Sequence, residues 1–143
     1  MADEKVLLVD DEEEFTSLLS ERMEARGLHV ETAASGAGAL KKTQERHYDV
    51  IVLDLAMPGM DGIETLRRLL ADNPDLQVIL LTGQATVQKG IEAIKLGARE
   101  VIEKPADLSA LLAKIAEAKH DRVLLVQKRM EEQVRSILRT KGW

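Results

Sequence analysis

Three aspartates stand at two places in the sequence where carboxylates could do chemistry. Asp10 and Asp11 follow the apolar run KVLLV, and Asp54 ends the apolar run VIVL. If the three carboxylates meet in one crevice, each pair at ~4 Å repels by roughly 4 kcal/mol at an effective dielectric constant of 20. Such a cluster takes up a proton or a cation, and carboxylate oxygens with no histidine or cysteine nearby favour Mg²⁺. The aspartates are therefore a candidate magnesium site, in which Mn²⁺ can substitute.

Two further polar residues close apolar runs. Thr82 ends the run ILLT, and Lys104 ends VIEK directly before Pro105. A carboxylate nucleophile, a cation, a hydroxyl group and an ammonium group together form the set that phosphoryl transfer needs. The charges agree with this interpretation. Three carboxylates, Mg²⁺ and a lysine sum to zero, and a dianionic acyl phosphate on Asp54 leaves only −1.

Taken singly, each of these residues also has an ordinary structural explanation. Asp10 or Asp11 fits an N-cap of the helix that follows, and Asp54 fits an Asx turn. Thr82 is a natural strand residue, and Lys-Pro commonly opens a turn. The functional interpretation depends on all five side chains meeting in one place.

Five short aliphatic runs supply the elements that would bring them together. The runs cover residues 5–10, 28–32, 48–54, 76–82 and 99–103. Alternating strands and helices predict a parallel α/β sheet. The first, third and fourth runs are almost wholly apolar, as buried central strands are, whereas the second and fifth carry the charges of edge strands. We therefore expect a five-stranded sheet in the flavodoxin-like order 2-1-3-4-5, with helices on both faces and the functional crevice at the carboxyl ends of the first and third strands.

Apolar residues between the runs recur at helical spacing. Gly27 and Gly97 stand where two of these helices should end. The stretch 35–46 has a weaker apolar pattern. The apolar stripes are Phe15, Leu18, Leu19 and Met23; Ile63, Leu66 and Leu70; Val87, Ile91 and Ile94; and Leu108, Leu111, Leu112 and Ile115.

Composition excludes several classes of protein. There is no cysteine, so disulfides, thiolate catalysis and cysteine-ligated metal centres are excluded. Residues 1–118 carry 13 Lys or Arg and 22 Asp or Glu, a net charge of −9, which argues against nucleic-acid binding by the body. The N-terminal apolar run is too short for a signal peptide or a membrane span, so a cytoplasmic protein with no membrane span is the expectation.

The motifs VDDEEEF, LDLAMPGMDG, LLTG and VIEKP resemble, in order and spacing, the hallmark segments of response-regulator receiver domains of two-component phosphorelays. The resemblance covers residues 5 to about 118. It implies a signalling protein, not a conventional enzyme, that supports only its own phosphorylation and dephosphorylation. Its partner would be a sensor histidine kinase or a phosphotransfer protein.

The resemblance also implies a role for each motif residue. Asp54 would be the phosphoacceptor and one side of the metal site, with Asp11 and the carbonyl of Ala56 binding Mg²⁺ directly and Asp10 binding it through water. Thr82 would be the switch hydroxyl and Lys104 would pair with the phosphoryl group. Structural roles beside the site would fall to Pro58, Gly62 and Pro105.

Two positions depart from the family pattern. Ala56, two residues after the acceptor, is smaller than the usual polar or Met residue, and the other departure changes the expected switch. The family carries Tyr or Phe three residues before the lysine, and here that position is Val101. A swinging aromatic ring therefore cannot carry the signal. We expect a backbone shift of residues 83–90 and of the helix after them.

Two other classes of protein share parts of this pattern. A metal-dependent phosphatase of the haloacid-dehalogenase type also uses a strand-end aspartate, but it needs a second aspartate two residues later, where this chain has Ala56. A flavodoxin-like cofactor binder needs a phosphate-binding loop after the first strand, and the acidic DDEEE would repel phosphate there.

Residues 119–143 differ from the body in charge and pattern. They carry 7 Lys or Arg and 3 Asp or Glu, a net charge of +4. Apolar residues recur at helical spacing along this stretch: Val123, Val126, Met130, Val134 and Ile137. We expect a receiver domain at 1–118 and a helical extension at 119–143, which either continues the last helix or is kinked near 120.

The extension is too short for a DNA-binding or catalytic output domain. The chain is therefore either a stand-alone receiver or the receiver part of a longer protein, and its output partner is unknown. The apolar stripe is expected to pair with the same helix of a second chain, a homodimer, or with an output partner. One alternative is a solvated helix that is left over from a larger protein. Another is that the basic residues of the extension pair with the acidic body: Lys128, Arg129, Arg135 and Arg139.

Overall fold

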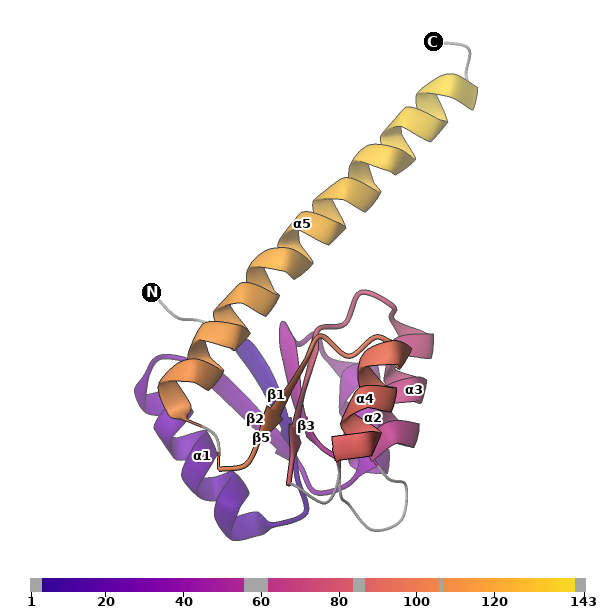
Figure 1. Ribbon diagram of the computed structural model, residues 1–143. Coiled ribbons are helices and arrows are strands. Elements are labelled where there is room, and N and C mark those ends of the chain that lie inside the picture. Colours follow the sequence, from indigo (N-terminus) through magenta and orange to yellow (C-terminus); the bar gives the residue numbers. More distant parts are fainter. Residues whose placement is uncertain (1–3, 56–61, 84–86, 106, 141–143) are drawn as a thin grey trace.

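The computed structural model describes residues 4–55, 62–83, 87–105 and 107–140, in which strands and helices alternate along the chain (Figure 1). The strands are β1 (Lys5–Val9), β2 (His29–Ala33), β3 (Val50–Asp54), β4 (Val78–Thr82) and β5 (Glu100–Glu103). The helices are α1 (Glu13–Ala25), α2 (Gly36–Glu45), α3 (Gly62–Asp72), α4 (Val87–Leu96) and α5 (Leu108–Thr140). All five predicted strands are present within one or two residues of their expected bounds.

The strands form one parallel sheet in the order β2-β1-β3-β4-β5. Every residue of β3 and β4 is buried, because helices cover both faces of these central strands. β2 and β5 lie at the edges and are mostly half-buried or exposed. Figure 1 shows α1 and α5 on one face and α2, α3 and α4 on the other. The predicted fold class, strand order and edge strands are confirmed.

The sheet separates two apolar cores. Successive side chains of a strand point to opposite faces, so Leu7 and Val9 enter one core while Val6 and Leu8 enter the other. The first core is closed mainly by α2, α3 and α4. The second is closed by α1 and α5, whose buried contacts include Met23, Leu111, Ile115 and Ala118. Both cores are almost wholly aliphatic, as the composition requires.

Three helix ends show how local sequence sets the bounds. Gly27 and Gly97 follow α1 and α4 with φ angles of +93° and +118°, a backbone region that favours glycine, so both predicted stops are confirmed. Ser35 caps α2 by accepting a hydrogen bond from the backbone N–H of Gly38 at 3.0 Å.

In α1, Leu18 is 49% exposed, so this member of the predicted stripe does not join the core.

The large apolar residues of α4 face solvent, so the apolar stripe predicted for this helix does not lie in the core. Ile91 and Ile94 are 49% and 45% exposed, whereas Gly90 and Ala93 are buried. A Cβ added to Gly90 would lie 3.2 Å from Cγ1 of Val101 on β5. Small residues therefore let α4 approach the sheet closely, and the large apolar residues lie on a different side of the helix.

Helix α5 runs without interruption from Leu108 to Thr140, about 50 Å at 1.5 Å per residue. Its first three turns pack on the sheet, and beyond residue 122 all its described side chains are exposed. The extension thus continues the last helix and leaves the body as a long arm (Figure 1). Among the described residues, no helix is long and apolar enough to cross a membrane.

Candidate functional site

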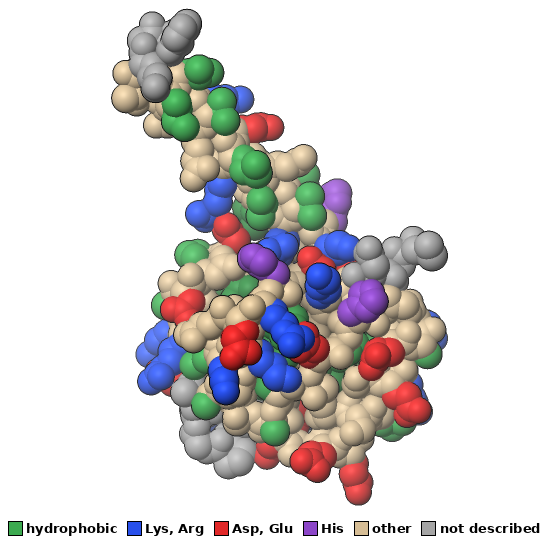
Figure 2. All heavy atoms as spheres, turned by 180° about the vertical axis from the view of Figure 1, so that it is seen from behind, with side chains coloured by type: hydrophobic (Ala, Val, Ile, Leu, Met, Phe, Trp, Pro, Cys, Tyr) green, Lys and Arg blue, Asp and Glu red, His purple; other side chains and the backbone are tan. Residues whose placement is uncertain are grey.

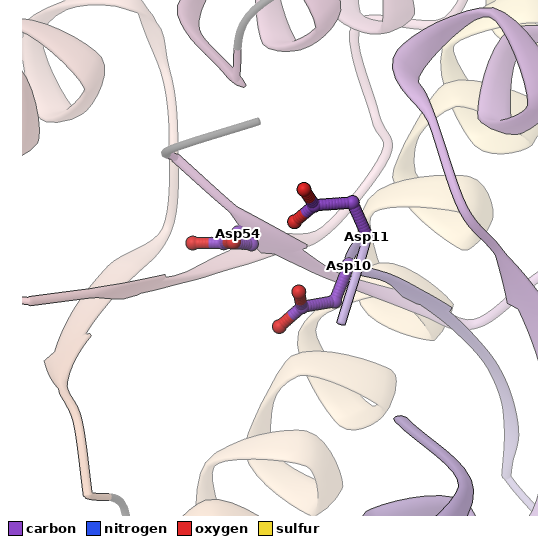
Figure 3. Close-up of side chains that lie close together, drawn as sticks. All are labelled: Asp10, Asp11 and Asp54. Carbon is purple, nitrogen blue, oxygen red and sulfur yellow. The ribbon is translucent and has the colours of Figure 1, made fainter. Parts of the chain in front are cut away.

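The carboxyl ends of β1 and β3 bring the three aspartates together. Val9 pairs with Leu53 in the sheet register, so Asp10 and Asp11, directly after β1, lie beside Asp54 at the end of β3. One carboxylate oxygen of each lies within 4.8 Å of the other two (Figure 3). Asp10 and Asp54 are 2% and 4% exposed, whereas Asp11 is exposed. Two of the three charges are therefore removed from water, and the third faces the crevice mouth.

Hydrogen bonds hold Asp10 in place. Its backbone N–H donates to the carbonyl of Ala33 at 3.1 Å, and its Oδ1 accepts from the backbone N–H of Glu12 at 3.0 Å. This second bond is an Asx turn that reverses the chain between β1 and α1. The N-cap residue of α1 is Glu12, so the alternative explanation of Asp10 or Asp11 as its N-cap is wrong.

Lys104 brings a positive charge to the cluster from the end of β5. Its Nζ lies 3.1 Å from Oδ2 of Asp10 and 3.7 Å from Oδ1 of Asp54. The same nitrogen lies 4.6 Å from the centre of the Phe15 ring. Burial lowers the pKa of Lys104, but the hydrogen bond to Asp10 and the charge of Asp54 outweigh it, and the pKa is raised above its ordinary value. The ammonium group therefore stays charged and offsets part of the carboxylate repulsion.

Thr82 ends β4 one position beyond the residue that pairs with Asp54. It is 3% exposed, and its hydroxyl donates to the carbonyl of Gly83 at 3.0 Å. A hollow of about 260 Å³ begins at Thr82 and is lined by Gly90, Val101 and the exposed isoleucines of α4. Val101 is half-buried against the first core. The side chain at this position fills little of the space between β5 and α4.

Gly62 begins α3 in close contact with the end of β3. Its N–H donates to the carbonyl of Leu55 at 3.2 Å, and a Cβ added there would lie 2.5 Å from Cα of Leu55. Only glycine fits this approach. Lys104 and Pro105 are joined by a cis peptide bond. Ala56, Pro58 and the side chain of Val87 lie outside the described residues.

The donor set of the aspartate cluster fits a hard divalent cation. All three candidate ligands are carboxylate oxygens, which suit Mg²⁺ or Mn²⁺ better than they suit softer metals. Without a cation the described cluster holds three carboxylates and one ammonium, an excess of negative charge in a largely buried place. Asp10, Asp11 and Asp54 are the side chains of this chain that would bind such an ion.

Comparison with known proteins decides between the candidate families. A family model described as the response regulator receiver domain matches residues 6–116, most of the chain. This chain belongs to the response regulator receiver domain family. The receiver fold and the predicted resemblance are confirmed, and the haloacid-dehalogenase alternative has no support.

Two curated relatives and one solved structure give the extent of the likeness. The transcriptional regulatory protein ZraR of Klebsiella oxytoca is 34% identical over 113 residues, which are 79% of this chain and 26% of that protein. The photosynthetic apparatus regulatory protein RegA of Cereibacter sphaeroides is 38% identical over 117 residues, covering 79% of this chain and 64% of that protein. The crystal structure of a response regulator receiver domain protein from Clostridium thermocellum has a TM-score of 0.82 and 32% identity, and covers 85% of this chain and 98% of that one. The receiver chain thus spans about a quarter of the length of ZraR.

Some residues of the receiver site were not found from the sequence. Phe15 was assigned only to an apolar stripe, although its ring lies against Lys104. The signal available was its position in the first turn of α1, four residues after Asp11. The ion pairs that bind α5 to the body were also only partly foreseen, because each joins residues far apart in the chain: Arg99–Asp121, Arg122–Asp49 and Arg129–Asp75.

Proposed function

We propose that this receiver domain accepts a phosphoryl group on Asp54 from the phosphohistidine of a sensor kinase or phosphotransfer protein, in a reaction that needs Mg²⁺ or Mn²⁺. The observation that supports the proposal is the convergence of Asp10, Asp11 and Asp54 on one crevice with Lys104 beside them. Asp54 is the nucleophile in this proposal because it stands at the place of the phosphoacceptor in the receiver motif LDLAMPGMDG.

The transfer moves one phosphoryl group between two side chains. A carboxylate oxygen of Asp54 forms a bond to phosphorus while the phosphorus–nitrogen bond of the phosphohistidine breaks, and the electron pair of that bond returns to the imidazole. A bound divalent cation supplies positive charge to the carboxylates and the phosphoryl oxygens. Lys104 supplies a second positive charge to the same oxygens. With Asp54 phosphorylated and the divalent cation bound, the site carries a net charge of −1. The unphosphorylated cluster without the cation carries −2.

The roles proposed for the neighbouring residues are those that the resemblance to receiver domains implies. Asp11 and the carbonyl of Ala56 would bind the cation directly, and Asp10 would bind it through water. Thr82 turns its hydroxyl from Gly83 towards the phosphoryl group, and Pro58, Gly62 and Pro105 shape the loops around it. Because Val101 has no ring and lines a hollow together with residues of α4, we propose that phosphorylation is transmitted by a movement of α4 and not of a ring.

The experiment that tests this function measures intact mass. The purified chain is incubated with a small-molecule phosphodonor, with Mg²⁺ or with a chelator. We expect a gain of one phosphoryl group that needs the cation and is absent in Asp54→Asn. Asp49→Asn, which changes a carboxylate outside the cluster, is the control and should be phosphorylated normally. Phosphorylation of Asp54→Asn at the normal rate would exclude Asp54 as the acceptor.

The proposed domain division places the receiver at 1–118 and a helical extension at 119–143, with dimerisation through residues 123–138. Figure 2 shows hydrophobic side chains along the protruding helix. Val123, Met130 and Ile137 are 46%, 60% and 57% exposed and repeat every seven residues, with Val134 between the last two. An isolated helix that exposes such a stripe is only marginally stable in water.

We propose that a second copy of this chain covers the stripe. The charged residues of the extension leave this stripe free for such a partner. Lys128, Arg129, Glu132, Arg135 and Arg139 lie away from the seven-residue repeat of Val123, Met130 and Ile137, so like charges do not meet when two such helices pair. Arg129 binds Asp75 of the body, as part of the alternative foresaw, but the apolar stripe lies on a different side of the helix and stays exposed.

A further inference from the structure

The ring of Phe15 lies against the ammonium group of Lys104. Phe15 is in the first turn of α1, directly after the acidic residues 10–14, and it is half-buried. The distance from Nζ of Lys104 to the ring centre is 4.6 Å, within the range of a cation–π interaction. It is the only phenylalanine in the sequence.

Three groups surround the Lys104 ammonium. Asp10 accepts its hydrogen bond at 3.1 Å, and Asp54 lies 3.7 Å away. The Phe15 ring covers another side, and the lysine side chain is only 22% exposed. An aromatic face attracts a cation but offers no strong hydrogen-bond acceptor. The ring therefore holds the ammonium in place and excludes water without competing with the carboxylates for its N–H groups.

We propose that Phe15 is a positioning residue for phosphoryl transfer, because its ring holds the Lys104 ammonium where the phosphoryl oxygens of Asp54 will lie. The inference rests on the proposed function of Asp54. A positive group that is already in place when charge develops lowers the barrier more than one that must first leave water. Phe15 acts through Lys104 and touches neither the cation nor the acceptor.

A purely structural role for Phe15 has a different consequence. Its side chain also packs on the second apolar core, beside Leu19. Loss of that packing lowers the free energy of unfolding but leaves the transfer rate of the folded protein unchanged. The two roles are separated by measuring stability and rate on the same variants.

The test uses the full chain and five variants. Phe15→Leu keeps an apolar side chain but removes the ring, and Phe15→Tyr keeps the ring. Leu19→Val is the matched control, because it reduces packing in the same core without removing the ring beside Lys104. Lys104→Gln is combined with Phe15→Leu in a double-mutant cycle. Each protein is assayed for its melting temperature, its Mg²⁺ affinity and its rate of phosphorylation by a small phosphodonor.

We expect Phe15→Leu to slow phosphorylation about three- to tenfold, the range that a cation–π contact of this kind corresponds to. Mg²⁺ affinity should be retained, Phe15→Tyr should restore the rate, and Leu19→Val should change only the melting temperature. In the Lys104→Gln background, Phe15→Leu should have no further effect on the rate.

Two results would overturn the inference while leaving the proposed function intact. One is a folded Phe15→Leu protein that is phosphorylated on Asp54 at the normal rate. The other is an equal loss of rate from Phe15→Leu with and without Lys104. If the unaltered chain is not phosphorylated, or if Asp54→Asn is, the proposed function itself fails, and the inference fails with it.

Discussion

Nζ of Lys104 lies 3.1 Å from Oδ2 of Asp10, although the two residues are 94 positions apart in the chain. The pair joins the end of an edge strand to the end of a central strand, and it places a positive charge beside two buried carboxylates. A bound divalent cation and the ammonium group of Lys104 would therefore both neutralise the negative charge of the same carboxylates.

Divalent cations should raise the melting temperature of the chain by relieving repulsion among the three carboxylates. Asp11→Ala should remove most of that rise, because the exposed Asp11 carboxylate completes the cluster at its mouth. Asp72→Asn, at the end of α3, is the control and should keep the full rise. Thermal unfolding with Mg²⁺ and with a chelator measures the effect, and an unchanged Mg²⁺ response in Asp11→Ala would remove Asp11 from the metal site.

Lys104→Met should destabilise the chain when no divalent cation is present. It leaves Asp10 and Asp54 buried without their ammonium partner, a loss of roughly 1–3 kcal/mol in the free energy of unfolding. Mg²⁺ should restore most of this stability, because the cation replaces the lost charge. Denaturant titrations at several Mg²⁺ concentrations measure both effects. A variant that no longer responds to Mg²⁺ would place Lys104 among the metal-binding groups.

The single tyrosine of the chain, Tyr48, should ionise only above the ordinary range of a tyrosine. Burial raises the pKa of Tyr48, and the negative charge of Glu31 raises it further. Since the pKa is higher in the folded than in the unfolded chain, the resulting stability is fully present below the unfolded value of 10.0 and is lost as pH rises through the folded value. Alkaline titration of phenolate absorbance, with and without denaturant, checks the direction.

Tyr48→Phe should raise stability at neutral pH by about 1 kcal/mol. The buried Tyr48 hydroxyl has no hydrogen-bond partner among the described residues, and removing such a group relieves its desolvation cost. In this variant, stability should also no longer fall at alkaline pH through ionisation of a tyrosine. A fall in stability at neutral pH would show that the hydroxyl has a partner in solution.

Phosphorylation should change amide exchange mainly in residues 83–90, in α4 and around 101–107. Small residues form the contact between α4 and β5, with Gly90 against Val101, so the helix can shift without moving a large side chain. Gly90→Ala should disturb this contact and increase exchange in α4 before phosphorylation. Changes confined to the loop after Asp54 would contradict a movement of α4.

Substitution of the exposed stripe should abolish dimers of the full chain. Met130→Glu combined with Ile137→Glu puts charges into the proposed interface, whereas Glu132→Lys changes a charge outside the stripe and is the control. Sedimentation equilibrium should show dimers for the unaltered chain and the control, and monomers for the double variant. A monomeric unaltered chain at high micromolar concentration would leave the dimer without support.

The sequence alone determined the sheet and the meeting of three aspartates at one edge of it. Apolar runs mark the strands, the charges on two runs mark the edges, and parallel strands bring their carboxyl ends to one edge. Asp10, Asp11 and Asp54 had to meet there once the strand order was known. Gly27 and Gly97 likewise ended helices because their backbone angles are local properties.

Only the tertiary structure decided which side chains touch across the sheet and which helix faces are buried. Gly90 and Ala93 pack α4 by close approach, which periodicity of large apolar residues cannot reveal. Phe15 meets Lys104, and Arg129 meets Asp75, because separate elements are placed side by side by packing of the two cores. The spacing of residues along one helix or strand indicates which of them share a face. Which other element packs against that face depends on residues far away in the chain.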